Sequence, residues 1–282
     1  EASEVVGMDE RPQDALRRKK DSSMRVAVNL VKKGEARACV SAGNTGALLA
    51  TARFVLGMIP GIDRPAIVSA VPAAHGHTVM LDLGANPDCS AENLVQFAVM
   101  GSVIATDLHG IDRPRVGLLN IGEEDIKGTD EIREAHRRLA VAPINYAGFV
   151  EGDDIFSGDV DVVVTDGFAG NVALKTMEGV ARFIGSVMRE EFTRNPLRKI
   201  GGLAAAPSLK ALKSRLDPSA YNGASMVGLA GVVIKSHGGA SRAAFASAVR
   251  VAIAEARKGV PDQISDLMAR VSAATASAPP SS

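Results

Sequence analysis

The residues best suited to chemistry in this chain lie in turns that directly follow apolar, strand-like segments. Each turn combines glycine with an amide, an acid or a cation, and together they span residues 41–46, 82–87, 120–124, 166–171 and 235–239. In an open α/β sheet, ligands bind at the carboxyl ends of the strands. Glycine, asparagine and aspartate also dominate ordinary turns, but so many turns of one kind favour a convergent polar site.

The turn Ser41-Ala42-Gly43-Asn44-Thr45-Gly46 is the strongest single feature. Its glycines allow the backbone to approach an anion closely, and the free N–H groups of the predicted helix that follows can donate to it. Asn44 and Thr45 can add side-chain donors. The turn therefore predicts a phosphate-binding loop formed by Gly43, Asn44, Thr45 and Gly46. The alternative is a tight strand-to-helix turn with Thr45 as the N-cap.

Basic and imidazole side chains accompany two of the other turns. Lys175 lies one helical turn beyond Asn171, on the same face of the predicted helix. Lys235 and His237 follow the apolar run 231–234 and place a cation and an imidazole at a further strand end. The simpler interpretations are a surface lysine for Lys175 and a turn residue for His237.

Several familiar motifs are absent from the sequence. It has no G-x-x-x-x-G-K-[ST] loop, no G-x-G-x-x-G after a strand and no G-x-S-x-G elbow, which argues against nucleotide-binding and serine-hydrolase sites. His75 and His77 flank a glycine in a predicted hairpin turn and are expected to be solvated loop residues. His109 and His136 are expected at helix ends or surfaces. No metal site and no cofactor are therefore predicted.

Composition limits the class of protein further. The 32 basic and 32 acidic side chains cancel, so no global field indicates nucleic acid. Cys39 and Cys89 have no C-x-x-C spacing, which favours a reducing compartment. The apolar runs are too short to span a bilayer and no signal peptide is recognisable, so a cytoplasmic location is predicted.

Short β-rich runs alternate with helical patterns, as expected for βαβ units around a mainly parallel sheet. The predicted strands are 36–41, 66–71, 78–83, 115–121, 144–150, 161–165 and the apolar run 231–234. The predicted helices are 14–33, 45–56, 90–108, 130–140, 171–191, 240–256 and 261–273. The pattern predicts one α/β domain over residues 1–276 and a disordered tail at 277–282, whose composition is poor in core-forming residues.

Two basic segments interrupt this pattern. Between Arg194 and Leu216 there are six basic residues and no acidic ones, with apolar residues at spacings of three and four that form an amphipathic hairpin. These apolar residues are Leu197, Ile200, Leu203, Leu209 and Leu212. The hairpin could lie on an anionic membrane or pack on a partner subunit, and the sequence leaves both open. The second segment is the cluster Arg17-Arg18-Lys19-Lys20, predicted on a helix.

Several long sequence strings resemble the PlsX family of bacterial phosphate acyltransferases. They are S-A-G-N-T-G-A (41–47), P-G-I-D-R-P-A (60–66), L-D-L-G-A-N (81–86), Q-F-A-V-M-G-S (96–102), R-V-G-L-L-N-I-G-E-E (115–124), T-D-G-F-A-G-N-V-A-L-K-T-x-E-G (165–179) and I-K-S-H-G (234–238). The resemblance implies a homodimeric three-layer α/β/α enzyme related to isocitrate dehydrogenase and phosphotransacetylase. It also implies that an N-terminal segment with a first strand and an M-G-G-D loop is missing here. One departure is Asn222, in a Tyr-Asn-Gly-Ala-Ser segment where the family usually has two adjacent glycines.

The resemblance implies transfer of a long acyl chain from acyl carrier protein to inorganic phosphate, giving acyl-phosphate for glycerolipid synthesis. For such a reaction we expect Lys175 and Asn171 to stabilise developing charge and His237 to protonate the leaving thiol. Asp82, Asn86, Asp166 and Lys235 are expected to support these groups. The alternative is a short-chain phosphotransacetylase that uses coenzyme A.

The two basic segments gain expected partners from the same resemblance. Arg17, Arg18, Lys19 and Lys20 become a candidate docking patch for acyl carrier protein, which is acidic. The hairpin 194–216 becomes a candidate membrane contact at the inner face, near a downstream glycerol-3-phosphate acyltransferase. A solvated helix face remains the alternative for the basic patch.

Overall fold

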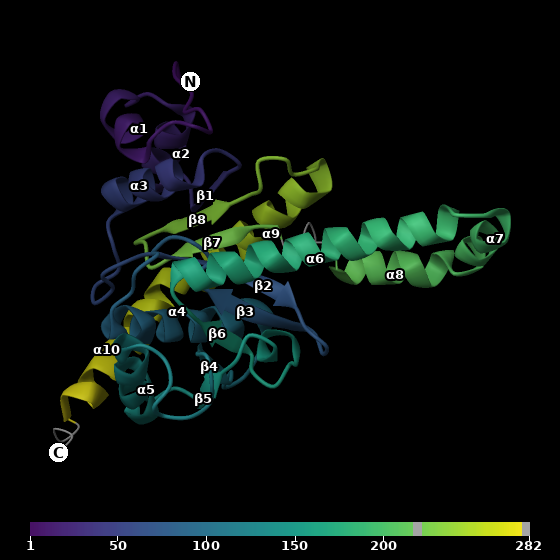
Figure 1. Cartoon of the computed structure of the whole chain (residues 1–282). Helices are drawn as coiled ribbons and strands as arrows, with labels where there is room; N and C mark the ends of the chain where they lie inside the picture. Colours follow the sequence, from purple (N-terminus) through teal and green to yellow (C-terminus); the bar gives the residue numbers. More distant parts are fainter. Residues whose placement is uncertain (217–221, 278–282) are drawn as a thin grey trace.

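A mixed β-sheet with helices on both faces forms the body of the protein (Figure 1). The computed structural model describes residues 1–216 and 222–277. Its strands are β1 (Ala38–Ser41), β2 (Ala66–Pro72), β3 (His77–Leu81), β4 (Val116–Leu119), β5 (Tyr146–Val150), β6 (Val162–Val164), β7 (Ala224–Val227) and β8 (Val232–Lys235). Its helices are α1 (Pro12–Arg18), α2 (Ser23–Lys32), α3 (Thr45–Leu56), α4 (Ala91–His109), α5 (Asp130–Val141), the 3-10 turn η1 (Asp154–Phe156), α6 (Gly167–Thr193), α7 (Pro196–Ala204), α8 (Ala206–Leu216), α9 (Arg242–Lys258) and α10 (Val260–Ser277).

Strand order in the sheet is β1-β8-β7-β2-β3-β6-β4-β5. The pairs β1–β8, β3–β6, β6–β4 and β4–β5 are parallel, whereas β8–β7, β7–β2 and β2–β3 are antiparallel. The three-layer α/β prediction is confirmed, and most pairings are parallel. The antiparallel strands at the centre place the carboxyl ends of β1 and β8 at the opposite edge of the sheet from those of β3 and β6. Strand β7 was not predicted.

Helix α4 is the central element of the larger core. Ser90 begins it with a reciprocal capping box to Asn93, and Gly110 ends it in the left-handed conformation with a φ of 69°. Its buried side chains pack on Val68, Leu81 and Val162 of the sheet. The opposite face is covered by α2 and α3 near β1 and β8, and by α6 near β3.

Most predicted elements differ from the structure by a few residues at their ends, and two predictions need a fuller correction. The helix expected at 14–33 is two helices, because the chain turns after Arg18 and the Ser22 hydroxyl then caps α2 by accepting from the Arg25 N–H. In the predicted tail 277–282, Ser277 is the last residue of α10, and 278–282 lie outside the described residues.

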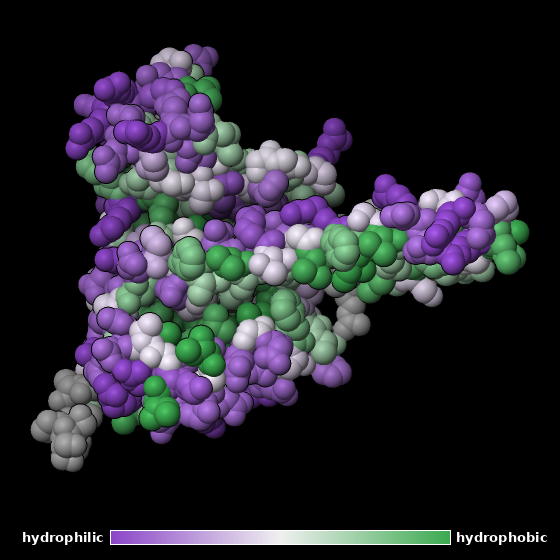
Figure 2. Space-filling model, viewed as in Figure 1, coloured by the Kyte–Doolittle hydropathy of each residue, from purple (hydrophilic) through white to green (hydrophobic). Residues whose placement is uncertain are grey.

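A long arm projects from the body and consists of the outer part of α6 together with α7 and α8 (Figure 1). The predicted hairpin 194–216 forms only part of it, since the 27 residues of α6 carry the hairpin away from the sheet. Apolar side chains gather along the arm's surface (Figure 2). Exposed members include Val180, Phe183, Ile184, Val187, Leu197, Ile200, Leu203 and Leu212. Within the described residues, no helix is both long and apolar enough to cross a membrane.

Candidate functional site

A cleft of about 770 Å³ lies between α6 and the sheet. Its lining includes five of the residues predicted to act in the site: Thr45, Asn171, Lys175, Lys235 and His237. Apolar side chains of Ile67 and Leu83 form part of the same wall. The cleft extends beneath α6 from the β3 side to the β8 side, so it joins turns from opposite edges of the sheet.

Asp82 lies behind one end of the cleft and holds the backbone of residues 84–86 there. Its side chain is fully buried, and its carboxylate accepts hydrogen bonds from the backbone N–H groups of Ile67 (2.9 Å), Gly84 (3.2 Å), Ala85 (3.0 Å) and Asn86 (2.7 Å). The Asn86 amide donates to the same carboxylate and to the Pro65 carbonyl. Burial raises the pKa of Asp82, while these donors oppose that rise. Both side chains are engaged in this way within the protein, consistent with supporting roles.

The start of α6 packs directly on this loop. Asp166 caps the helix, its carboxylate accepting from the Ala169 N–H at 2.8 Å. A Cβ on Gly167 would lie 2.8 Å from the Asn86 carbonyl oxygen, and one on Gly170 would overlap the Asp82 carbonyl oxygen. These glycines therefore permit a backbone-to-backbone contact that no side chain could replace. That contact determines where Asn171 enters the cleft.

Lys175 enters the cleft already paired with an acid. Its ammonium lies 3.0 Å from the Glu178 carboxylate, and Arg182 lies 3.7 Å from the same group. The Lys175 side chain is 54% exposed and that of Glu178 only 17%. An arriving phosphate could replace Glu178 as the partner of Lys175. Sequence reasoning missed Glu178, although its spacing of three residues from Lys175 indicates a helical pair.

The Gly43–Gly46 turn differs in detail from the prediction. Asn44, rather than Thr45, caps α3, its side-chain oxygen accepting from the Ala47 N–H at 3.0 Å. The Asn44 amide donates to the carbonyls of Gly7, Met8 and Glu10 and so holds the N-terminal segment against the turn. Pro12 packs against Gly46. Thr45 lines the cleft, so it, rather than Asn44, is the residue of this turn that can donate to an anion there.

Asn222 holds the turn that carries His237. Its side-chain oxygen accepts from the His237 N–H at 2.9 Å, and its amide donates to the Ser236 hydroxyl (2.9 Å) and the Ala244 carbonyl (2.8 Å). The His237 Nδ1 accepts from the Gly239 N–H at 3.0 Å, so the neutral ring carries its proton on Nε2. Burial lowers the pKa of Lys235, whose ammonium donates to the Ser236 carbonyl. Sequence reasoning noted Asn222 as a departure but not as part of the site.

Replacing Asn222 with alanine is expected to lower kcat about 10- to 100-fold, because we expect His237 to act in catalysis and displacing a catalytic group by about 1 Å can have effects of this size. Asn222→Asp keeps an acceptor for the His237 N–H and should restore part of the loss. Steady-state rates and melting temperatures of both variants test this. A wild-type kcat in the alanine variant would show that His237 does not depend on Asn222.

His77 differs from its predicted environment, whereas His109 lies at a helix end, as predicted. His77 is the first residue of β3, and its ring lies 4.1 Å, centroid to centroid, from that of His109 at the end of α4. Burial lowers the pKa of His77 and lowers that of His109 to about 4. The prediction that His77 is a solvated loop residue is wrong, because the β2–β3 hairpin turns it toward α4. Among the described residues, no group of three or more His, Cys, Asp or Glu side chains is placed to hold a metal ion.

Comparisons with known proteins identify the family of the chain. The sequence pattern of a family described as "Fatty acid synthesis protein" matches residues 1–263. The phosphate acyltransferase of Nitrosococcus oceani is 62% identical over 264 residues, which cover 94% of this chain and 78% of that protein. That of Alkalilimnicola ehrlichii is 61% identical over 263 residues, covering 93% and 77% of the two chains.

The chain belongs to the phosphate acyltransferase family. The resemblance stated from the sequence motifs is thus confirmed, as is the prediction of an enzyme of this family. Solved structures support the fold alone. A phosphotransacetylase from Streptococcus pyogenes superposes with a TM-score of 0.60 at 19% identity, over 87% of this chain and 70% of that one. A branched-chain phosphotransacylase from Enterococcus faecalis gives a TM-score of 0.54 at 13% identity, over 84% and 80%.

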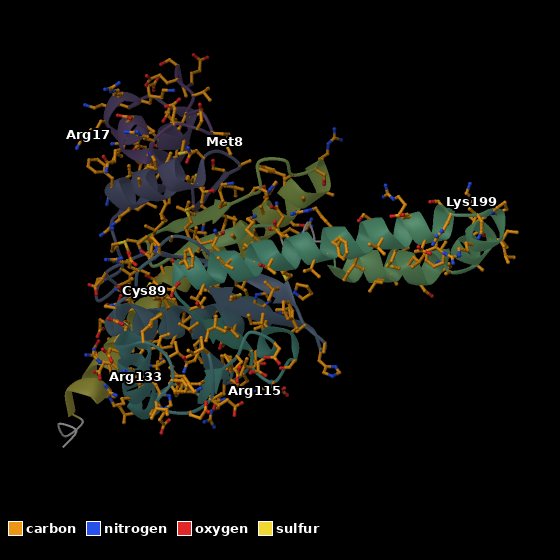
Figure 3. All side chains as sticks on the ribbon, viewed as in Figure 1. Met8, Arg17, Cys89, Arg115, Arg133 and Lys199 are labelled. Carbon is orange, nitrogen blue, oxygen red and sulfur yellow. The ribbon has the colours of Figure 1, made fainter. Side chains whose placement is uncertain are left out.

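Other predicted contact residues of this phosphate acyltransferase lie away from the cleft. Arg17 projects from the outer surface of α1, far from the arm that carries Lys199 (Figure 3). Arg18 and Lys20 are also exposed, whereas Lys19 donates to the Val5 carbonyl and pairs with Glu10. On the arm, Leu197, Ile200 and Leu203 are 79%, 65% and 75% exposed.

Proposed function

We propose that this protein transfers a long-chain fatty acyl group from acyl carrier protein to inorganic phosphate, forming acyl-phosphate for phospholipid synthesis. The observation that carries the proposal is the cleft beneath α6. It gathers Lys175, Lys235 and His237 with Thr45 at the start of α3, which suits a small, multiply charged anion. Membership in the phosphate acyltransferase family supports the same reaction.

In the proposed reaction, a phosphate oxygen attacks the thioester carbonyl carbon. A new C–O bond forms, the carbonyl oxygen becomes negative, and the C–S bond then breaks to release a thiolate. Lys175 and the Asn171 amide stabilise the developing negative charge, and the Nε2–H of His237 donates a hydrogen bond to the departing sulfur. The proton that the thiolate takes up is the one that hydrogen phosphate loses when it becomes acyl-phosphate. Phosphate is already an anion at neutral pH, so the site must chiefly position it and shield it from water.

An assay that traps acyl-phosphate as a hydroxamate tests the function directly. Palmitoyl-acyl carrier protein, palmitoyl-coenzyme A and acetyl-coenzyme A are compared as donors at saturating phosphate. The proposal predicts phosphate-dependent product and the highest kcat/KM with the carrier protein. Preference for acetyl-coenzyme A would instead favour the short-chain alternative, and no acyl-phosphate from any donor would refute the proposal.

The exposed basic residues at the end of α1 and just after it, Arg17, Arg18 and Lys20, are proposed to dock the acidic carrier protein. Changing both Arg17 and Lys20 to glutamate is expected to raise the apparent KM for palmitoyl-acyl carrier protein about three- to tenfold at low salt, because long-range attraction is reversed. The KM for palmitoyl-coenzyme A should not change. Arg257 and Lys258, exposed on the last turn of α9, provide a matched double reversal as a control. Equal effects in the two double variants would argue against docking at α1.

The chemistry of the product leads us to propose that the enzyme contacts a membrane. Acyl-phosphate is an amphiphile, and an enzyme in the cytoplasm that contacts the inner face of the membrane could deliver it to a glycerol-3-phosphate acyltransferase. Exposed Leu197 and Ile200 on α7 suit a shallow membrane contact.

A homodimer, also expected, could cover part of the apolar surface of α6. Sedimentation with anionic vesicles and light scattering test these two proposals, and a monomer that stays unbound would refute both.

A further inference from the structure

The segment of residues 7–12, which we call the strap, crosses the turn that begins α3. Asn44 in that turn is 9% exposed, and its side-chain amide points toward the strap backbone. The amide donates to three strap carbonyls, those of Gly7 (3.3 Å), Met8 (3.0 Å) and Glu10 (2.9 Å). Residues 7–11 form no helix or strand of their own, so these hydrogen bonds fix the path of the backbone.

Further contacts hold the strap in place. The Glu10 carboxylate accepts from the Gly7 N–H at 2.8 Å and pairs with the Lys19 ammonium. Hydrogen bonds from Lys19, and then from the Gly7 N–H, lower the pKa of Glu10. At the other end, Pro12 packs so closely on Gly46 that a Cβ there would lie 2.8 Å from the proline ring. The strap is therefore held along its whole length.

Met8 extends from the strap to a second turn, the one that follows β8. A Cβ on Gly238 would lie 3.5 Å from the Met8 methyl group, which is a van der Waals contact distance. The neighbours of Gly238, His237 and Gly239, line the cleft, as Thr45 does in the first turn. The strap therefore joins the two turns that supply Thr45 and His237, and Met8 lies at this rim of the cleft.

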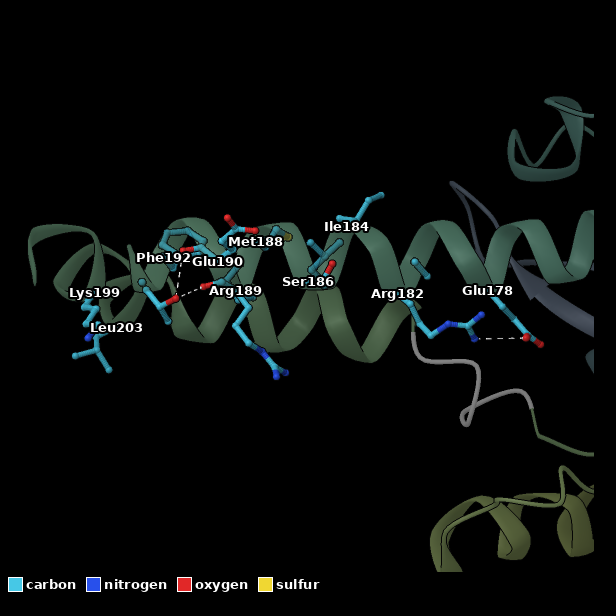
Figure 4. Close-up of a pocket in the computed structure, with 16 residues that line it drawn as sticks. Glu178, Arg182, Ile184, Ser186, Met188, Arg189, Glu190, Phe192, Lys199 and Leu203 are labelled. Atoms are coloured by element: carbon cyan, nitrogen blue, oxygen red, sulfur yellow. Dashed lines mark hydrogen bonds and ion pairs between the residues drawn. The ribbon is translucent and has the colours of Figure 1, made fainter. Parts of the chain in front are cut away.

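The rim that α6 forms has a different character. There Glu178 pairs with Arg182, and both residues line the cleft (Figure 4). That rim is charged, whereas Met8 presents a flexible apolar thioether beside the His237 turn. An apolar group at the rim of a closed site keeps water out, and the exclusion of water protects a reactive acyl group from hydrolysis.

We propose that Met8 determines the choice between phosphate and water as the acyl acceptor. The inference rests on the proposed function, because it concerns the thioester bound in the same cleft. If water reaches the carbonyl carbon, its oxygen forms the new C–O bond, the C–S bond breaks, and a proton of the water passes to the departing sulfur. The products are a free fatty acid and a thiol, and no acyl-phosphate forms. The strap lowers this side reaction by holding the Met8 side chain against the turn that carries His237.

Three variants provide the test. Met8→Ser replaces the thioether with a small polar group, and Met8→Leu keeps an apolar side chain of similar volume. Val5→Ser introduces the same serine at a residue that precedes the strap and is 72% exposed. The donor is palmitoyl-acyl carrier protein, with hydroxylamine present to trap acyl-phosphate and free palmitate measured by chromatography. The melting temperatures should stay close to that of the wild type, because Met8 is 64% exposed.

The measured quantity is the ratio of free palmitate to acyl-phosphate at saturating phosphate. Met8→Ser is expected to raise this ratio at least about tenfold, because the rim no longer excludes water. Met8→Leu and Val5→Ser should stay within about twofold of the wild type. A wild-type ratio in Met8→Ser would overturn the proposal, and so would an equal rise in Val5→Ser. A lower kcat with an unchanged ratio would also overturn it, since the strap would then be only a structural support.

Asn44→Ser tests whether Met8 depends on the anchor of the strap. Serine is a good helix cap and can replace the Asn44 oxygen that accepts from the Ala47 N–H. Its shorter side chain cannot also donate to three strap carbonyls, so the ratio should rise as it does in Met8→Ser. Because both changes act on the same rim, the double variant should show no larger rise than Met8→Ser alone. A wild-type ratio in Asn44→Ser would overturn the role assigned to Asn44.

Failure of this inference can be told apart from failure of the proposed function. If the wild-type protein forms no acyl-phosphate from any donor, the proposed function fails. If it forms acyl-phosphate and Met8→Ser keeps the wild-type ratio, only the role of Met8 fails.

Discussion

Replacing Lys175 with alanine is expected to lower kcat about 10²- to 10³-fold, as does removal of one preorganised group that stabilises charge in an acyl-transfer transition state. The reason lies in the cleft, which Lys175 lines together with Asn171, Lys235 and His237. Its ammonium can follow the charge as it moves from phosphate to the carbonyl oxygen. The melting temperature should stay close to that of the wild type, because the side chain is 54% exposed.

Glu178 provides the control for Lys175. In the free protein its carboxylate lies 3.0 Å from the Lys175 ammonium and neutralises it. Glu178→Gln should leave kcat within about threefold of the wild type, and it should lower the KM for phosphate, because phosphate no longer competes with the Glu178 carboxylate for Lys175. Lys175→Arg should retain part of the activity because it keeps the charge. Wild-type kcat in Lys175→Ala would remove this residue from the mechanism. Equal losses in Lys175→Ala and Glu178→Gln would point to the ion pair as a structural element instead.

The sequence was most informative about local structure. Continuous apolar runs and capping residues predicted most strands and helices to within a few residues, since period and caps are local signals. Strand direction is not local. The reversal at β7 comes from how Ala224–Val227 packs between β2 and β8, and a run of four residues is too short to carry a periodic signal for it.

The individual roles within the candidate site were harder to predict for a related reason. Asn44 has the residue type of an anion ligand, but the N-terminal segment at 7–10 occupies its amide. Asn222 and Glu178 contribute through partners that are apparent only once the chain is folded. The turns near the cleft were therefore identified from composition, whereas the division between binding and supporting residues depends on tertiary hydrogen bonds.

Glu255 is a buried acid that no sequence pattern indicated. It lies on α9, is 2% exposed, and borders a cavity of about 340 Å³ between α4 and α9 together with Ser225, His109 and Arg250. One of its carboxylate oxygens has no hydrogen-bond partner among the described residues. Burial raises the pKa of Glu255 to about 8, and the Ser225 hydroxyl opposes this rise only in part. The native protein therefore holds a proton at Glu255 that the unfolded chain releases near its ordinary pKa of 4.5.

This excess proton fixes the sign of the pH dependence. Between about pH 4.5 and 8 the native state binds more protons than the unfolded state, so the contribution of Glu255 to the free energy of unfolding falls as pH rises and is lost above about 8. His109 acts in the opposite direction, since its pKa is lowered from 6.5 to about 4 and its neutral form is favoured by folding. Above about pH 6.5 His109 is neutral in both the native and the unfolded state, so its contribution to the free energy of unfolding no longer changes with pH. The contribution of Glu255 continues to change between about pH 6.5 and 8.

Chemical denaturation of the wild type and of Glu255→Gln across that range tests the assignment. The difference in unfolding free energy, wild type minus variant, is expected to fall by about 2 kcal/mol, because one excess proton changes stability by about 1.4 kcal/mol per pH unit. Glu190→Gln, at an exposed position on α6, should give a difference that does not change with pH. A constant difference for Glu255→Gln as well would mean that Glu255 is ionised in the native protein. The cavity beside it would then have to supply water or a cation to its unpaired oxygen, since an isolated buried carboxylate is too unfavourable to persist.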